Sequence, residues 1–168
     1  MKSFGLLILL CAFTFSAALY ASNWEDGKAR IKIEVLNAFQ QKFPNATDVE
    51  WEKEGRYYVA EFKSLLNTGT NRQICDMEAW FDSKANWKMT VSDVVYQILP
   101  AAIKEAFTSG NFGTWKVDDA HIVERDGKEN LYLLEVEQGR NERDLIYNHK
   151  GELVKELKND LGDYKSLL

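Results

Sequence analysis

Few side chains in this chain could act as a nucleophile or a general base. Cysteine occurs only at positions 11 and 75, and histidine only at positions 121 and 149. A cysteine nucleophile would require Cys75 to meet one of the two histidines in the fold. Cys75 lies two residues before Met77 in an apolar alternating stretch, where cysteine is often a small buried residue. We therefore predict no catalytic residue and no enzymatic activity, and Cys75 is the main candidate should that prediction be wrong.

Motifs that bind metals or phosphates are missing from the sequence. It contains no CxxC, HExxH or HxH spacing, and no GxSxG sequence that marks a serine nucleophile. "TSGNFGTW" has two glycines but follows an expected helix, whereas a phosphate loop opens one. Glu50, Glu52 and Glu54 alternate and could meet a cation, although such acids more often form a solvated strand edge. We expect no metal ion and no cofactor.

Residues 1–21 have the three parts of a secretory signal peptide. Lys2 gives a positive start, "FGLLILLCAFTF" an apolar core, and "SAALYA" the small residues of a cleavage site. We place the cleavage after Ala21, with Ala18 as an alternative, because the apolar stretch is short for an uncleaved membrane anchor. Cleavage would leave Cys75 as a single cysteine, so no internal disulfide could form. We expect a periplasmic or secreted protein with no membrane span after cleavage.

The charge of the chain argues against two classes of partner, and its composition and length suit one folded domain. It has 26 acidic and 21 basic residues, a formal net charge of −5, which argues against nucleic acid and anionic membrane surfaces. The hydrophobic content of 45% can supply a core without disulfides. Residues 22–168 have a length that suits one domain.

The first half of that domain has the pattern of one helix followed by strands. Residues 26–44, "DGKARIKIEVLNAFQQKFP", have helical apolar spacing, with Asp26 as a candidate cap and Pro44 as a stop. "DVEWE" alternates, "KEG" predicts a turn, and "RYYVAEFK" predicts the next strand. "SLLNTGTNRQ" is a loop or an extended hairpin tip, after which "ICDMEAWFD" and "WKMTV" predict two further strands around the turn "DSKAN".

The second half repeats this order. Pro100 opens a predicted helix in "ILPAAIKEAFTSGNF", and Gly110 ends it. "DDAHIVE", "NLYLLEVE", "RDLIYN" and "LVKEL" predict strands, with a hairpin signal in "RDGKE". Glu61 and Glu135 match at an offset of 74 (135 − 61). We interpret the pattern as an internal duplication, with repeats at about 24–90 and 91–157 and a tail after them. The alternative is a chance likeness between amphipathic hairpins.

Two such units predict an α+β fold, in which both helices cover one face of an antiparallel sheet of about eight strands. Side chains of one alternation phase would form this first face and the core. They are Tyr58, Ala60, Phe62, Ala79, Phe81, Tyr132, Leu134, Val136 and Tyr147.

The opposite alternation phase forms the second face of the predicted sheet. It displays Tyr57, Val59, Glu61, Trp80, Leu131, Leu133, Glu135 and Ile146. A solvated face is normally more polar, and aromatic side chains mixed with carboxylates are typical of protein-binding patches. The alternative is that this face is covered by the tail, whose apolar residues Leu157, Leu161, Tyr164 and Leu168 have helical spacing.

The order of these segments resembles a known family. A helix ending in "AFQQKFP" is followed by "VEW", "YYVAEF", "AWFDSKANW" and "LPAAIKEAF". This order resembles the PepSY-like, beta-lactamase-inhibitor-like family of exported bacterial proteins, common in Bacteroides-type bacteria, over nearly all of residues 24–157. The family's FDxxGxW-like hairpin matches residues 81–87, with Ala85 where glycine is usual. The second copy, residues 147–153, keeps Gly151 but lacks the tryptophan.

The resemblance implies a tandem helix-plus-sheet fold similar to the beta-lactamase inhibitory protein, in which the concave sheet face grips an enzyme. Related PepSY domains are associated with peptidase inhibition, and the family supplies no catalytic motif. We therefore expect a non-enzymatic, inhibitor-like module that binds a protein or peptide of the cell envelope through the second face. The alternative is a carrier or sensor of a small ligand, with a cleft lined by Tyr58, Phe81 and Tyr132.

Overall fold

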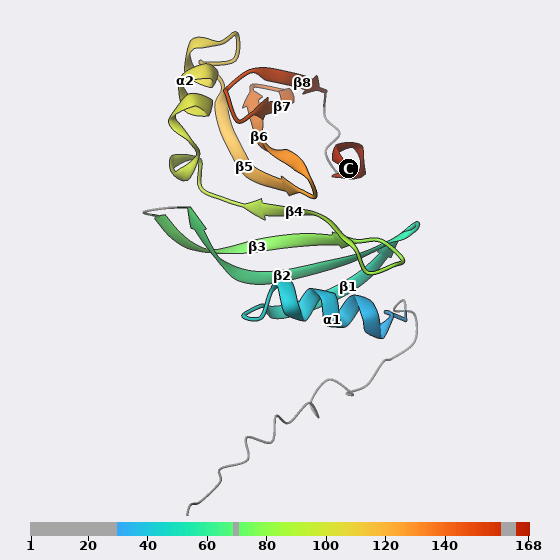
Figure 1. The fold of residues 1–168 in the computed structure, drawn as a ribbon. Helices are drawn as coiled ribbons and strands as arrows, with labels where there is room; N and C mark the ends of the chain where they lie inside the picture. Colours follow the sequence, from blue (N-terminus) through green and yellow to red (C-terminus); the bar gives the residue numbers. More distant parts are fainter. Residues whose placement is uncertain (1–29, 69–70, 159–163) are drawn as a thin grey trace, which may run out of the picture.

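The computed structural model describes residues 30–68, 71–158 and 164–168 of the chain (Figure 1). The predicted signal peptide, Asp26 and Leu161 lie outside these residues. The elements follow the chain in the order α1 (Ile33–Lys42), β1 (Thr47–Glu54), β2 (Tyr57–Thr68), β3 (Asn71–Phe81), β4 (Trp87–Asp93), the 3₁₀ helix η1 (Tyr96–Ile98), α2 (Ala101–Ser109), β5 (Lys116–Arg125), β6 (Lys128–Gln138), β7 (Asn141–Asn148), β8 (Leu153–Leu157) and the 3₁₀ helix η2 (Tyr164–Leu167).

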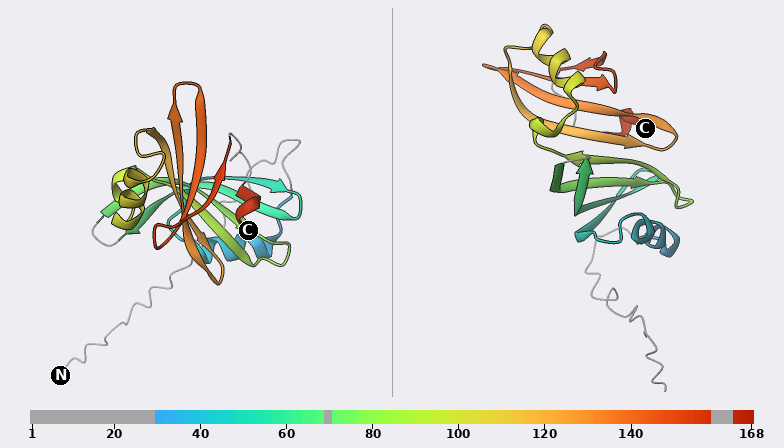
Figure 2. Two further views of the ribbon diagram at one scale, coloured as in Figure 1. Left: turned by 90° about the horizontal axis from the view of Figure 1, so that it is seen from above. Right: turned by 60° about the vertical axis from the view of Figure 1, so that its left-hand side comes forward.

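The eight strands form one sheet whose spatial order is the chain order, β1 to β8, and every neighbouring pair is antiparallel. The prediction of an α+β fold with an eight-stranded antiparallel sheet is therefore confirmed. The sheet twists strongly, so that β1–β4 and β5–β8 run in clearly different directions (Figures 1 and 2). The segment predicted as a loop or hairpin tip takes the second form, because β2 and β3 pair as far as Thr68 and Asn71.

Helix α1 is shorter than its apolar pattern predicted, whereas α2 ends as predicted, with Gly110 as its C-cap. α1 begins at Ile33, since Lys32 has extended backbone (φ −69°, ψ 141°), and Ile31 reaches the core from outside the helix with 8% of its surface exposed. α1 ends at Lys42, two residues before Pro44, as predicted. Pro100 is the N-cap of α2, one position earlier than a first-turn residue, because its ψ of 146° is extended.

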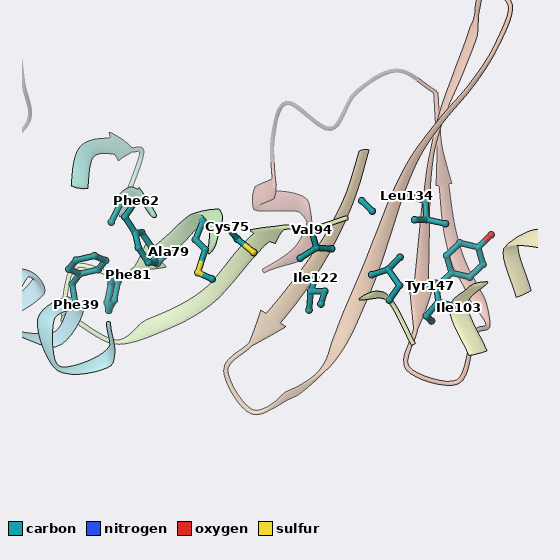
Figure 3. Close-up of a cluster of buried hydrophobic side chains, with 14 of the residues drawn as sticks. Phe39, Phe62, Cys75, Ala79, Phe81, Val94, Ile103, Ile122, Leu134 and Tyr147 are labelled. Carbon is teal, nitrogen blue, oxygen red and sulfur yellow. The ribbon is translucent and has the colours of Figure 1, made fainter. Parts of the chain in front are cut away.

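One hydrophobic cluster joins the first face to both helices. Val35 and Phe39 of α1 and Ile103 and Phe107 of α2 are buried in it. The nine residues predicted for the first face all belong to this cluster, eight of them buried and Tyr132 partly buried. Figure 3 shows Phe39, Phe62 and Phe81 at one end of the cluster and Ile103, Leu134 and Tyr147 at the other, with Cys75, Val94 and Ile122 between them.

Candidate functional site

Strand pairing defines the second face of the sheet. Val59 lies opposite Trp80, Leu133 opposite Ile146, and Leu131 opposite Val123. Directly opposite residues in an antiparallel pair point to the same side of the sheet. The sheet therefore brings the sequence-predicted site residues of β2, β3, β6 and β7 onto one face, next to Met89 and Val91 of β4.

The eight predicted site residues differ in exposure. Val59, Leu133, Ile146, Trp80 and Leu131 are buried, and Tyr57 and Glu135 are half-buried. Glu61 is exposed. The five buried residues belong to a second hydrophobic cluster with Met89, Val91, Val123 and Leu167, and Tyr57 packs against it. In this arrangement the apolar part of the second face is an interior surface.

The cover over this surface comes from the C-terminal segment, residues 164–168. Leu167 is buried with 5% of its surface exposed, and Tyr164 and Leu168 pack against the same cluster, as does Leu157 at the end of β8. In Figure 1 the segment, in red, lies on the side of β5 and β6 away from α2. Of the two alternatives left open by the sequence, the structure has the second face covered. The covering residues form a 3₁₀ turn rather than an α-helix, and the central residue is Leu167.

Polar contacts hold the C-terminal segment at its two ends. Lys165 Nζ forms an ion pair with the Glu54 carboxylate at the end of β1. The Arg125 guanidinium donates from Nη1 to the Leu167 carbonyl oxygen at 3.4 Å and from Nη2 to the Glu129 carbonyl oxygen at 2.8 Å. Lys165 Nζ also lies 5.9 Å from the centroid of the Trp80 ring. The segment therefore combines an apolar anchor with a cation placed at an acidic strand end.

An acidic groove of about 330 Å³ continues the second face beyond Tyr164. Four carboxylates contribute to its wall, together with Phe62, Met77, Val91 and His121; they are Glu61, Asp76, Glu78 and Asp93. Burial, together with the nearby carboxylate of Glu61 and against the opposing effect of the Trp80 indole, raises the pKa of Glu78 to about 7. Burial also raises the pKa of the Tyr164 hydroxyl. Four carboxyl groups are thus gathered where the groove meets Tyr164 of the C-terminal segment.

His121 lies at the floor of this region and is 7% exposed. Its Nδ1 is 3.5 Å from Asp93 Oδ1, its Nε2 is 3.2 Å from Glu135 Oε1, and its ring centroid is 6.1 Å from that of Tyr164. His121 is not among the residues predicted for the second face. The signal was present, because His121 alternates in phase with Val123 in "DDAHIVE".

The geometry around Cys75 does not favour a thiolate. The thiol is buried, and its Sγ donates to the Gln73 carbonyl oxygen at 3.7 Å. Burial raises the pKa of the Cys75 thiol, and the carboxylates of Asp93 and Asp76 raise it further. A nucleophilic cysteine needs the opposite shift. Cys75 borders a second hollow, of about 410 Å³, between the ends of β3, β4 and β5.

The remaining candidates for a metal ion or for catalysis in the sequence are the β1 carboxylates and His149. Glu50 and Glu52 are exposed on β1, and His149 Nδ1 pairs with Glu129 Oε2 at 2.9 Å. Within residues 30–68, 71–158 and 164–168, no three His, Cys, Asp or Glu side chains are grouped to hold a metal ion. None of the helices in these ranges is long and apolar enough to cross a membrane.

Comparison with known proteins gives matches to one family. The profile of the beta-lactamase-inhibitor-like, PepSY-like family matches residues 63–155. A BLIP-like protein from Bacteroides fragilis is 31% identical over 82% of this chain and 93% of its own, with a TM-score of 0.69. A DUF2874 family protein from Bacteroides ovatus is 26% identical over 77% of this chain and 89% of its own, with a TM-score of 0.68.

A further similar structure, from Bacteroides eggerthii, is provisionally described as periplasmic. It is 22% identical over 83% of this chain and 96% of its own, with a TM-score of 0.70, which indicates a shared fold. A search of curated proteins found no significant match. The family profile covers more than half of the chain, and the B. fragilis protein covers most of it. The chain therefore belongs to the beta-lactamase-inhibitor-like, PepSY-like family.

Proposed function

We propose that this protein is an exported, non-enzymatic module that binds a protein or peptide of the cell envelope through the second face of its sheet. The observation that carries the proposal is the composition of this face, in which aromatic and aliphatic side chains adjoin a groove of four carboxylates. Apolar surface rimmed by polar groups is a common feature of protein-binding sites when it is exposed, as the apolar part of this face would be with the C-terminal segment displaced. The family's likeness to beta-lactamase inhibitors supports binding as the mode of action.

The eight residues assigned to this face have two roles in the proposal. Glu61, Tyr57 and Glu135 are accessible to a partner as the chain stands. The five buried residues would meet a partner only when the C-terminal segment is away; they are Val59, Trp80, Leu131, Leu133 and Ile146. If the bound partner is an enzyme, binding at this face would inhibit it.

The carrier or sensor alternative has less support. It requires a cleft lined by Tyr58, Phe81 and Tyr132, but Phe81 is fully buried and Tyr58 is 6% exposed in the first cluster. The two hollows described above are lined by other residues. A binding module therefore fits the described geometry better than a carrier with an internal cleft.

We also propose that the domain, residues 22–168, is a tandem repeat with both helices on the first face. Each half has a helix followed by four strands. Tyr58 pairs with Phe81 as Tyr132 pairs with Tyr147, so the register of β2 and β3 matches that of β6 and β7. Buried residues of both helices share one cluster with this face. Export is part of the proposal and depends on the signal-like pattern of residues 1–21.

Affinity capture from a cell-envelope extract tests the proposed function. Glu61→Lys on the second face should lower recovery of a specific partner at least about tenfold, because it reverses a charge in the acidic groove. Glu34→Lys on the exposed side of α1 makes the same change elsewhere and should leave recovery unchanged. Equal recovery with both variants would place the binding surface elsewhere, and recovery of no specific partner would contradict a binding module.

A further inference from the structure

The C-terminal segment packs against the apolar part of the second face. Beneath it, Val59, Leu133 and Ile146 are at most 1% exposed, and Trp80 is 3% exposed. These values are typical of a domain core, and among the described residues the cover includes residues 164–168 and Leu157. Side chains of the C-terminal segment therefore contribute to closing a surface that spans strands from both halves of the sheet.

The attachment of the segment differs from that of the strands. β8 is held to β7 by a ladder of main-chain pairing, whereas residues 164–167 form a single 3₁₀ turn. The contacts described for this turn are the apolar anchor of Leu167, the Lys165–Glu54 ion pair, the Arg125 bond to the Leu167 carbonyl and the Tyr164–His121 ring contact. Short terminal segments held by side chains belong to the parts of a protein that open at the lowest free-energy cost.

The chemistry of the segment matches the chemistry of its surroundings. Lys165 lies between Tyr164 and Leu167 along the chain and pairs with Glu54, and the adjoining groove carries four further carboxylates. This surface therefore accommodates an aromatic, a basic and an aliphatic residue from one short segment. A partner with the same order of side chains would meet the same apolar floor and the same negative charge.

We propose that residues 164–168 are a built-in occupant of a peptide-binding surface, and that a partner segment with a basic residue between aromatic and aliphatic ones displaces them. This inference rests on the proposed function. It specifies the side chains of the partner segment and the displacement of residues 164–168 that lets the partner bind. A segment tethered to its own site acts at an effective concentration on the order of millimolar. The face is therefore closed to weak ligands and open to a partner that binds it more tightly than the chain's own segment does.

A synthetic peptide of residues 164–168 with a fluorescent label is the probe, and its binding to the full chain is measured by anisotropy. Leu167→Asp should release the segment, because a carboxylate cannot occupy the apolar site without a large desolvation cost. We expect this variant to bind the peptide at least about tenfold more tightly than the unaltered chain does. Leu153→Asp makes the same change at a residue of β8 that is 45% exposed, and it should bind the peptide as weakly as the unaltered chain.

A second variant covers the case in which Leu167→Asp fails to fold, as judged by circular dichroism. Lys165→Ala removes the ion pair with Glu54 and the Nζ contact with the Trp80 ring at a half-buried position of the C-terminal segment, so the strand pairing of the sheet should be unaffected. Lys165→Ala should also bind the labelled peptide more tightly than the unaltered chain does, by a smaller factor than Leu167→Asp. A folded Leu167→Asp chain that binds no peptide, or equal binding by Lys165→Ala and the unaltered chain where Leu167→Asp does not fold, would overturn the inference.

Partner capture and peptide binding together distinguish a failure of this inference from a failure of the proposed function. A partner captured equally by the unaltered chain and by Leu167→Asp would contradict displacement and leave the binding module intact. Peptide binding by the released chain, without a partner in the envelope extract, would support the occupied surface and contradict the proposed function.

Discussion

Ala85 and Gly151 occupy equivalent positions in two turns that have the same hydrogen bonds. Ala85 has φ 65° and donates its N–H to the Asp82 carbonyl oxygen at 3.0 Å, and Gly151 has φ 84° and donates to the Asn148 carbonyl oxygen at 3.0 Å. In each turn the side chain at the first position accepts from two backbone N–H groups, two and four residues later. The two turns are 66 residues apart (151 − 85), and their identity supports the duplication that we propose.

The strain at Ala85 predicts a stabilising substitution. A left-handed backbone costs a residue with a Cβ about 1–2 kcal/mol, whereas glycine adopts it freely. Part of the gain is lost because glycine has more freedom in the unfolded chain. Ala85→Gly should therefore raise the free energy of unfolding by about 0.5–1 kcal/mol, measured by urea denaturation. A decrease would show that the Ala85 methyl contributes packing that outweighs the strain.

The reverse substitution in the second turn should be harmful. A Cβ at Gly151 would lie 2.6 Å from the Ala102 carbonyl oxygen and 3.2 Å from the Ala106 Cβ, both on α2. The clash adds to the cost of the positive φ, so Gly151→Ala should lower the free energy of unfolding by about 2–4 kcal/mol. Gly127→Ala is the matched control, since it has a positive φ of 64° but open space around the added Cβ. Equal losses for both variants would mean that contact between this turn and α2 is unimportant.

Alternation along the strands was enough to predict the sheet and its two faces. Tyr58 and Tyr57 differ by one position, and the period of two assigns them to opposite sides whatever the rest of the chain does. Helix bounds were less predictable, because Ile31 continues the apolar pattern of α1 while lying before the helix, which begins after the extended Lys32. A periodic pattern identifies the side chains that are buried, but it does not require them all to lie in the helix.

The local pattern of the tail gave a covered second face as one of two alternatives, but it could neither decide between them nor identify Leu167 as the buried residue. Leu167 contacts strands that precede it by tens of residues, and no periodicity within "YKSLL" distinguishes it from Leu168. His121 has the same difficulty, because its neighbours Asp93 and Glu135 are supplied by β4 and β6. Such positions depend on tertiary contacts between distant segments, which composition and spacing leave undetermined.

Phe39 should be among the most sensitive positions of the first cluster. Its ring lies 5.0 Å from that of Phe62, 5.2 Å from that of Trp51 and 5.4 Å from that of Phe43, measured between centroids. Phe39→Ala would leave a cavity between α1 and the sheet, at a cost of about 3–5 kcal/mol. Thermal unfolding followed by circular dichroism measures the loss. Ile33→Ala, at an α1 residue that is 61% exposed, should change stability by less than about 1 kcal/mol.

Cys75 should react slowly with thiol reagents in the native protein. The side chain is 3% exposed, and burial together with the Asp93 and Asp76 charges disfavours the thiolate that such reagents require. Labelling at pH 7 should be at least about a hundredfold slower than in the protein unfolded by guanidinium chloride. Rapid native labelling would reopen the interpretation of Cys75 as a nucleophile.

Glu78 should make the stability of the protein depend on pH. Its pKa is about 7 in the folded state, raised from 4.5 chiefly by burial and then by the nearby carboxylates of Glu61, Glu52 and Glu54. Below pH 4.5 the group is protonated in both folded and unfolded chains and has no effect on stability. As the pH rises from 4.5 to 7 the unfolded state ionises first, so the free energy of unfolding falls, and the loss is complete above pH 7.

Glu78→Gln removes this loss, so the variant should gain stability over the unaltered chain as the pH rises. With allowance for solvent screening at a half-buried site, the gain at pH 8 should be about 1–2 kcal/mol, and it should vanish near pH 4. Urea denaturation at both pH values measures it. Glu34→Gln, on the exposed side of α1, should show no such pH dependence. A constant difference between Glu78→Gln and the unaltered chain across this range would mean that Glu78 ionises as freely in the fold as in the unfolded chain.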